Sequence, residues 1–182
     1  YGAETVQLGG NAASGEDGAG SNYIVIVVPS GTQDSDENDS TQLEVSVDQP
    51  SGYSVTALQE GIEYYNDRSY AIVTLPQSMT DGNEQLIVTS NDDKGETSET
   101  FLEFTLTDQA TVYVAYDSRA TSQPTWLESD FNLTNMIIDV TDAMGFFNVY
   151  EATYESGAVQ LGGNAAPGAG GVESNYIVIT DN

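Results

Sequence analysis

The chain contains 182 residues, 38% of them hydrophobic, and its 29 acidic residues against three basic ones give a net charge of −26. A surface this acidic repels phosphates and anionic lipids, which excludes nucleic acid and membranes as partners. It suits a marine or halophilic setting, where salt screens the repulsion. The lack of cysteine and histidine excludes disulfides, thiolate chemistry, and the usual general base and zinc ligand.

The first element along the chain is a phrase that occurs twice. VQLGGNAASGEDGAGSNYIVIV begins at Val6 and VQLGGNAAPGAGGVESNYIVIT begins at Val159, so the offset is 159 − 6 = 153, and 16 of the 22 positions are identical. Identity at this level indicates duplication, as in a tandem array. We therefore expect residues 1–27 to be the closing hairpin of a preceding repeat or a donor segment, residues 28–41 to be an acidic linker or loop, and residues 42–182 to be one module.

The first copy ends in an apolar run that is typical of a strand buried on both faces. The run consists of Asn22, Tyr23, Ile24, Val25, Ile26, Val27 and Val28. One module has one place for such a strand, and we expect the second copy, at residues 175–179, to fill it. The first copy then either joins a neighbouring subunit or repeat, or occupies a symmetric position in the same sandwich as an internal pseudo-repeat.

From Gln42 onwards the hydrophobic residues follow a period of two, as in QLEVSVD, FLEFTL and TVYVAYD. Further β-branched and aromatic runs are SYAIVTL, QLIVTS, MIIDVT and FFNVYEATY, and turn-forming residues separate them. This spacing of about ten strands predicts an all-β fold, an antiparallel and jelly-roll-like β-sandwich. Helix is expected to be minor, with at most one turn in LESDFNLTNM, next to Trp126.

The residues from Gly52 to Thr180 also carry a family resemblance. The phrases YVAYDSR from Tyr113, PTWL from Pro124, LGGN from Leu161 and SNYIVI from Ser174 resemble a non-catalytic β-sandwich module of large secreted proteins of marine bacteria. The resemblance implies an extracellular accessory module, of a kind that often lies beside polysaccharide-degrading domains or in long arrays. The family usually carries more basic residues than this chain.

The basic residues form a first group of candidate site residues, because Arg68, Lys94 and Arg119 each follow an aspartate within two positions. They are interpreted either as ion-paired braces between loops or, for Arg119, as part of a ligand site. In the second interpretation Arg119, Asp117, Tyr116 and Trp126 line a sugar or peptide pocket. The alternatives are that Trp126 is partly buried core and that Tyr116 is a half-buried cross-strand partner.

Two acidic turns are candidate metal sites, and calcium is the metal expected there because it prefers oxygen ligands. One turn offers Asp81, Asn83 and Glu84, and the other offers Asn91, Asp92 and Asp93. Neither follows the spacing of an EF-hand loop.

The sequence favours a non-catalytic role. A carboxylate pair could hydrolyse glycosides without histidine, but no acid is singled out by its context. We expect a structural module of a repeat array or filament, in which strand addition from residues 22–28 joins copies of the chain or adjacent repeats. The alternative function is a carbohydrate-binding module whose partner is a polysaccharide.

The expected location is extracellular or at the cell surface. The chain starts at Tyr1 without a signal-peptide pattern, which we interpret as a mature, exported product. The sequence has no apolar run that approaches the roughly 18 residues needed to span a bilayer.

Overall fold

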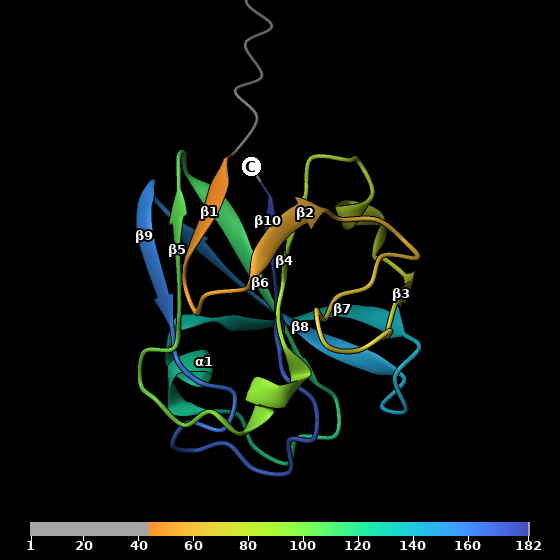
Figure 1. The fold of residues 1–182 in the computed structure, drawn as a ribbon, viewed down its shortest axis with the longest axis vertical. Coiled ribbons are helices and arrows are strands. Elements are labelled where there is room, and N and C mark those ends of the chain that lie inside the picture. The colour runs from red at the N-terminus through yellow and green to blue at the C-terminus, as the bar shows by residue number, and fades with distance from the viewer. Residues whose placement is uncertain (1–43, 182) are drawn as a thin grey trace, which may run out of the picture. The chain divides into compact units, whose positions relative to one another are not determined.

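The computed structural model describes residues 44–181, which form two antiparallel β-sheets (Figure 1). The smaller sheet has the strand order β1-β5-β9. Its strands are β1 (Val45–Gln49), β5 (Leu102–Leu106) and β9 (Gly157–Leu161). The predicted all-β sandwich is therefore confirmed.

The larger sheet contains seven strands in the order β2-β4-β10-β6-β8-β7-β3. Its strands are β2 (Ser54–Ala57), β3 (Ile72–Thr74), β4 (Gln85–Val88), β6 (Ala110–Asp117), β7 (Asn132–Val140), β8 (Phe146–Tyr154) and β10 (Ile177–Asp181). Neighbouring strands pair antiparallel throughout, and the sheet curls around its own inner face (Figure 1).

Helix is minor, as predicted. The one α-helix of the described residues is α1 (Thr125–Asp130), and two 3₁₀ turns are η1 (Gln77–Met79) and η2 (Asn91–Gly95). The chain leaves α1 earlier than the sequence pattern suggested, because β7 already begins at Asn132. None of the helices within residues 44–181 has the length and apolar character needed to cross a bilayer.

The seven-stranded sheet has a hydrophobic core on each face. One core lies against the smaller sheet and includes Phe104, Val114 and Val178, and the other includes Ile177 and Ile179. Because successive side chains of a strand point to opposite faces, β10 contributes to both cores. Each of its first four residues is fully buried. The apolar run of the second copy is therefore a strand buried on both faces, as predicted.

Strand β10 belongs to the second copy, as predicted, although it spans Ile177–Asp181 and not the predicted residues 175–179. It lies in the middle of the larger sheet, where Val178 is opposite Ile87 of β4 on one side and Val114 of β6 on the other. The predicted inter-subunit strand, from Asn22 to Val28, and the predicted segments 1–27 and 28–41 lie outside the described residues.

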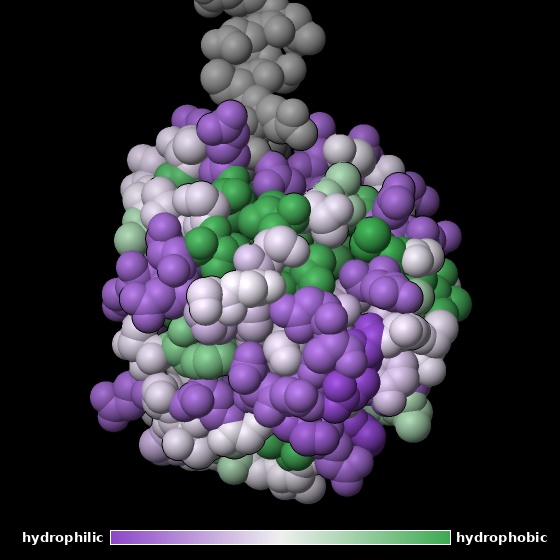
Figure 2. Space-filling model, viewed as in Figure 1, coloured by the Kyte–Doolittle hydropathy of each residue, from purple (hydrophilic) through white to green (hydrophobic). Residues whose placement is uncertain are grey.

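The surface of the module is hydrophilic only in part. On the face shown in Figure 2, hydrophilic residues cover the lower half, and apolar residues gather above them, over β1 and β2. A pocket between the two sheets is lined by Val45, Val55, Gln85 and Thr105, among others.

The loop that connects β9 to β10 makes close backbone contacts. Gly163 lies against the backbone carbonyl of Glu96, and a Cβ atom at this position would overlap with it. Gly162 lies against the indole ring of Trp126 in the same way. Glycine is therefore required at both positions by the available space.

We predict that Gly163→Ala destabilises the fold by about 1–3 kcal/mol, because the new methyl group must displace backbone rather than a mobile side chain. The matched control is Gly95→Ala, since a Cβ atom at Gly95 would meet no atom within 4 Å. Urea unfolding of both variants measures the difference. Equal midpoints for the two variants would contradict the tight packing of this loop.

Candidate functional site

The segment of residues 162–176, here called the closing loop, carries the chain from the smaller sheet to the larger one. Its buried polar side chains are hydrogen-bonded to neighbouring backbone. The Asn164 side-chain amide donates to the carbonyls of Lys94 at 3.0 Å and Ser174 at 3.1 Å, and the Tyr116 hydroxyl donates to the Asn164 carbonyl at 2.8 Å. Tyr176 closes the loop by donating its hydroxyl to the Gly162 carbonyl at 3.0 Å.

The end of the closing loop is fixed against η2. The Asn175 backbone amide donates to the Asn91 side-chain oxygen at 3.0 Å, and the Asn175 side-chain amide donates to the Ser90 carbonyl at 2.9 Å. The Tyr65 hydroxyl donates to the Asn175 carbonyl. Asn175 is fully buried, and these bonds offset the cost of removing its two amide groups and its backbone carbonyl from water, whereas its side-chain oxygen has no hydrogen-bond partner among the described residues.

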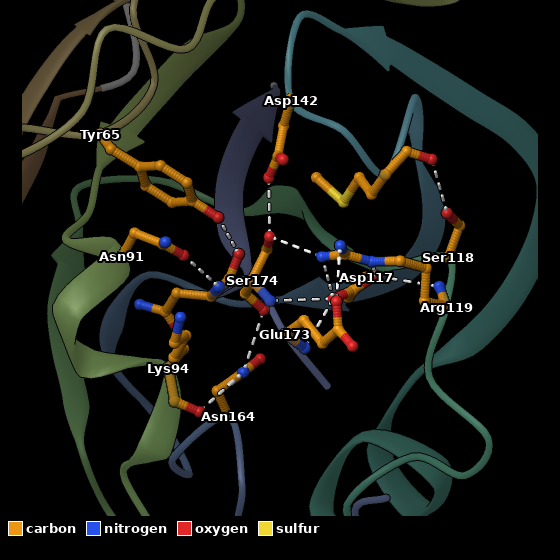
Figure 3. Close-up of polar contacts among 12 residues, drawn as sticks. Tyr65, Asn91, Lys94, Asp117, Ser118, Arg119, Asp142, Asn164, Glu173 and Ser174 are labelled. Atoms are coloured by element: carbon orange, nitrogen blue, oxygen red, sulfur yellow. Dashed lines mark hydrogen bonds and ion pairs between the residues drawn. The ribbon is translucent and has the colours of Figure 1, made fainter. Parts of the chain in front are cut away.

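Asp117, at the end of β6, is the centre of a network that holds the closing loop (Figure 3). Its buried carboxylate accepts hydrogen bonds from the backbone amides of Arg119, Glu173 and Ser174, each at 2.9 Å. It also accepts from the Arg119 side chain at two nitrogens, Nε and Nη2, again at 2.9 Å. The Ser174 hydroxyl extends the network to Asp142 at 2.7 Å.

This arrangement keeps Asp117 ionised. Burial would raise the pKa of the Asp117 carboxyl, but the hydrogen bonds from Arg119, Glu173 and Ser174 outweigh it and lower the pKa below the usual value. Arg119 also pairs with Glu173 at 2.9 Å and donates to the Ser174 hydroxyl at 2.8 Å. The contacts of Arg119 are therefore those of an ion-paired brace.

Arg68 makes a second brace, next to η2. It pairs with Asp67 at 3.1 Å and with Asp92 at 2.6 Å, while Asp67 accepts from the backbone amides of Asn91 and Asp92, both at 2.9 Å. Lys94 differs from the two arginines, since the ion pairs found within residues 44–181 do not include it.

Trp126 lies at the edge of a pocket of about 270 Å³ at the end of the sandwich where α1 is located. Its ring is half-buried, packs edge-on against Tyr176 with centroids 5.5 Å apart, and donates from Nε1 to the Gly163 carbonyl at 3.1 Å. The other residues that line the pocket are Glu99, Thr125, Ser129, Asp130, Ala166 and Pro167. Carboxylates and hydroxyls beside an indole ring are groups that can contact a sugar.

The four residues predicted to form one ligand site do not share this pocket. Trp126 lines it, whereas Tyr116, Asp117 and Arg119 do not. Tyr116 and Asp117 are each only 1% exposed, and their polar atoms are used by the closing loop. The structure thus separates the tryptophan from the Asp117–Arg119 network.

The two acidic turns also have different surroundings. In η2, Asn91 accepts from Asn175, Asp92 pairs with Arg68, and Asp93 accepts from the Tyr53 hydroxyl at 2.8 Å. These three side chains are therefore engaged in separate protein contacts.

In the other turn, residues 81–84, carboxylates lie close together. Oxygen atoms of Asp81, Glu84 and Asp181 lie within 4.8 Å of one another, and Asn83 takes part through its backbone amide, which donates to Asp81 Oδ1 at 3.2 Å. Burial raises the pKa of Glu84, and the charge of Asp81 adds to the effect. Asp181 was not among the residues that the sequence pointed to, because its proximity arises from strand pairing.

Sequence reasoning also missed the structural roles of Asn164, Ser174 and Asn175. A signal was present, because all three belong to the repeated phrase and are identical in its first copy. Asp142, which joins the network from the β7–β8 turn, has no comparable sequence signal.

Comparisons with known proteins show a similar fold, but they do not assign the chain to a family. No family model and no curated protein matches the chain. The structure is similar to part of a β-glucuronidase from glycoside hydrolase family 2, with a TM-score of 0.64 and 20% identity over 76% of this chain. An enzyme of family 138 that targets pectin rhamnogalacturonan II aligns over 75% of this chain with a TM-score of 0.48 and 14% identity. The chain spans 14% and 16% of those two proteins, respectively.

We predict that the module becomes less stable as the pH is lowered below about 4. The reason is that the folded-state pKa of Asp117 lies below its unfolded value of about 3.9. A depressed carboxyl pKa stabilises the fold above the unfolded value, and this contribution is lost as pH falls through the folded pKa. Asp117→Asn should cost about 3 kcal/mol at neutral pH and weaken the acid dependence. The control, Asp108→Asn, changes the same charge at an exposed turn. Denaturant unfolding between pH 3 and pH 7 gives the comparison, and equal acid dependence in both variants would contradict this role.

Proposed function

We propose that the described module is one unit of a non-catalytic extracellular repeat array and that the first copy of the repeated phrase closes another such unit. One observation carries the proposal. Every fully buried position of the second copy, residues 159–180, has the same residue in the first copy, with Thr180 as the one exception. The counterpart of Thr180 is Val27, which has nearly the same shape.

The differences between the copies support the same conclusion. Apart from Thr180, they fall on exposed or half-buried positions of the closing loop, namely Pro167, Ala169, Gly170, Val172 and Glu173. The buried polar residues Asn164, Ser174 and Asn175, whose hydrogen bonds hold the loop, correspond to Asn11, Ser21 and Asn22. The first copy therefore carries the side chains needed to make these same contacts in an equivalent environment.

That environment is better supplied by another unit than by the same sandwich. The position between β4 and β6 is occupied by β10. Tyr176 packs against Trp126, which is the only tryptophan of the chain, so the equivalent Tyr23 would find no second partner of this kind in one unit. Strand addition between units, with main-chain pairing and matching apolar contacts, would give the first copy the β10 position of another unit and would give Tyr23 the tryptophan of that unit. Repeated head-to-tail contacts of this kind form filaments unless they close into a ring.

The contacts of Asp117 favour a structural role over catalysis for this buried acid. Asp117 is fully committed to the closing loop, and its lowered pKa is the reverse of what a general acid needs at neutral pH. The strongly acidic exterior keeps neighbouring units soluble, particularly in the salt of a marine environment.

The proposal predicts that intact chains associate by exchange, the first copy of one chain taking the β10 position of another chain, and that deletion of residues 1–27 abolishes the association without lowering the melting temperature. The reason is that the described module already contains its own β10. Ile24→Asp in the intact chain should have the same effect, because it places a charge in the apolar run, whereas Asp17→Asn should leave association unchanged. Light scattering after size-exclusion chromatography and thermal unfolding provide the two measurements.

Two results would contradict this proposal. An unchanged assembly state after the deletion would exclude strand addition. A lower melting temperature of the truncated monomer would instead favour placement of the first copy in the same sandwich.

A second function, carbohydrate binding, is favoured by the pocket at Trp126. The indole ring is half-buried and lies beside the side chains of Glu99, Ser129 and Asp130, which are exposed. The similar region of the β-glucuronidase belongs to a carbohydrate-active enzyme, although the likeness concerns the fold alone. With a chain charge of −26, neutral oligosaccharides are better candidates than acidic ones.

For this second function we predict that neutral oligosaccharides change the fluorescence of the single tryptophan in a saturable way. Asp130→Asn should weaken binding by about 1–3 kcal/mol, the cost of an unpaired polar group in a site, while Asp108→Asn should have no effect. Fluorescence titration with β-linked gluco- and xylo-oligosaccharides tests this. A flat titration for every oligosaccharide would remove the carbohydrate-binding candidate.

A further inference from the structure

The carboxylates of Asp81, Glu84 and Asp181, here called the acidic triad, lie where the turn before β4 meets the end of β10. The triad is a product of strand register. In the antiparallel pairing of β10 with β4, Thr180 is opposite Gln85, and one further step places Asp181 opposite Glu84. Like charges directly opposite each other destabilise a sheet. A proton or a cation shared by these carboxylates would reduce the repulsion.

Glu84 makes the triad different from an ordinary acidic patch. Its side chain is almost completely removed from solvent, because the residue is 2% exposed. One carboxylate oxygen, Oε2, accepts a hydrogen bond from the Gly82 amide at 3.2 Å, whereas Oε1 is buried and has no hydrogen-bond partner among residues 44–181. An oxygen of this buried group lies within 4.8 Å of oxygens of Asp81 and Asp181. A buried carboxylate oxygen without a donor is costly unless a cation or proton satisfies it.

The protein supplies no basic side chain to this place. The chain has three Lys and Arg residues, and all three are described. Arg68 pairs with Asp67 and Asp92, and Arg119 pairs with Asp117 and Glu173. Lys94 belongs to η2, beyond the opposite end of β4 (Figure 1).

We propose that the acidic triad binds one calcium ion, which joins the turn of residues 81–84 to the end of β10. Three carboxylates from a turn and a strand end suit the flexible oxygen coordination of calcium, whereas magnesium usually takes one or two carboxylates and keeps several waters. A pocket of about 220 Å³ lined by Gly82, Asn83, Glu84 and Gln85 opens beside the triad. It leaves room for the waters that complete the coordination.

The bound ion gives the closing strand a second attachment. The Asp117 network holds the closing loop before β10 begins, and the ion holds the strand at its other end. The corresponding position of the first copy is occupied by Val28, since 181 − 153 = 28. The third ligand is therefore specific to the second copy. The inference does not depend on the proposed repeat array, because all three ligands belong to the described module.

The test uses the intact chain after removal of divalent ions with a chelator. Isothermal titration with CaCl₂ is carried out in about 0.5 M NaCl, which screens weak binding to the general acidic surface. We expect one calcium per chain, and tighter binding of calcium than of magnesium. Terbium offers a second readout, because Tyr113 lies near the triad. Burial raises the pKa of Tyr113, and the nearby charges of Asp181 and Glu84 raise it further. Terbium emission excited through tyrosine should therefore appear and be displaced by calcium.

The variants separate the site from surface charge. Glu84→Gln and Asp181→Asn should each weaken calcium binding by about tenfold or more. Glu128→Gln, which makes the same change as Glu84→Gln on the exposed side of α1, should leave it unchanged. Asp181→Asn provides a second test at a half-exposed strand end in case Glu84→Gln impairs folding. Addition of calcium should raise the melting temperature of Asp181→Asn less than that of the parent chain, because the variant lacks one of the three ligands.

Three results would overturn the inference. The first is the absence of saturable 1:1 binding in the parent chain. The second is equal affinity in Glu84→Gln and Glu128→Gln, which would mean that the calcium ion binds outside the triad. The third is a preference for magnesium, which would exclude the calcium assignment.

Discussion

The module depends on the pairing of β10 along both of its edges. β4 and β6 take its backbone hydrogen bonds, and its side chains enter the cores on both faces of the larger sheet. Without this strand, the sheet would divide into β2-β4 and β6-β8-β7-β3, each with an open, apolar edge that invites association with other chains. The fold is therefore closed by the last described strand, through contacts with residues far away in sequence. The repeated phrase contains this closing strand.

The closing loop shows how a chain with few cations can bury polar groups. A loop that crosses between two sheets must find partners for its own amides and carbonyls. Here Asp117 accepts from two loop amides, and Asn164 and Asn175 bridge the loop to neighbouring backbone. Ionised acceptors make stronger hydrogen bonds than neutral ones, but a buried carboxylate needs a counter-charge. Arg119 provides it, so a scarce basic residue is used where an acid is buried.

Local patterns predicted the strands, and they could not predict how the strands are arranged. Alternation identified β5 and β6, and the continuous apolar run identified β10 as buried on both faces, since these features depend on side-chain period alone. The short β2 and β9 were not separated from their surroundings, because they have few apolar residues to alternate. Arg119 and Asp117 are close in sequence and could be linked, whereas Ser174 and Asp142 join them only through the fold. Trp126 was grouped with the same residues by its position in the chain, and the fold places it in a different pocket.

The two copies agree at every fully buried position except Thr180, and they differ again where the strand leaves the core. Val27 and Val28 replace Thr180 and Asp181, so the first copy is the more apolar at this point. Beside β4 of the described module, Asp181 adds a charge to Asp81 and Glu84, whereas Val28 would add none. Pairing of β10 with its own module therefore carries an electrostatic cost that the proposed calcium ion would remove, and pairing of the first copy at the same position would carry no such cost. Two segments that fit one slot would in this way be distinguished by a charge at the strand end, while Thr180 and Val27 are the one pair that differs at a fully buried position.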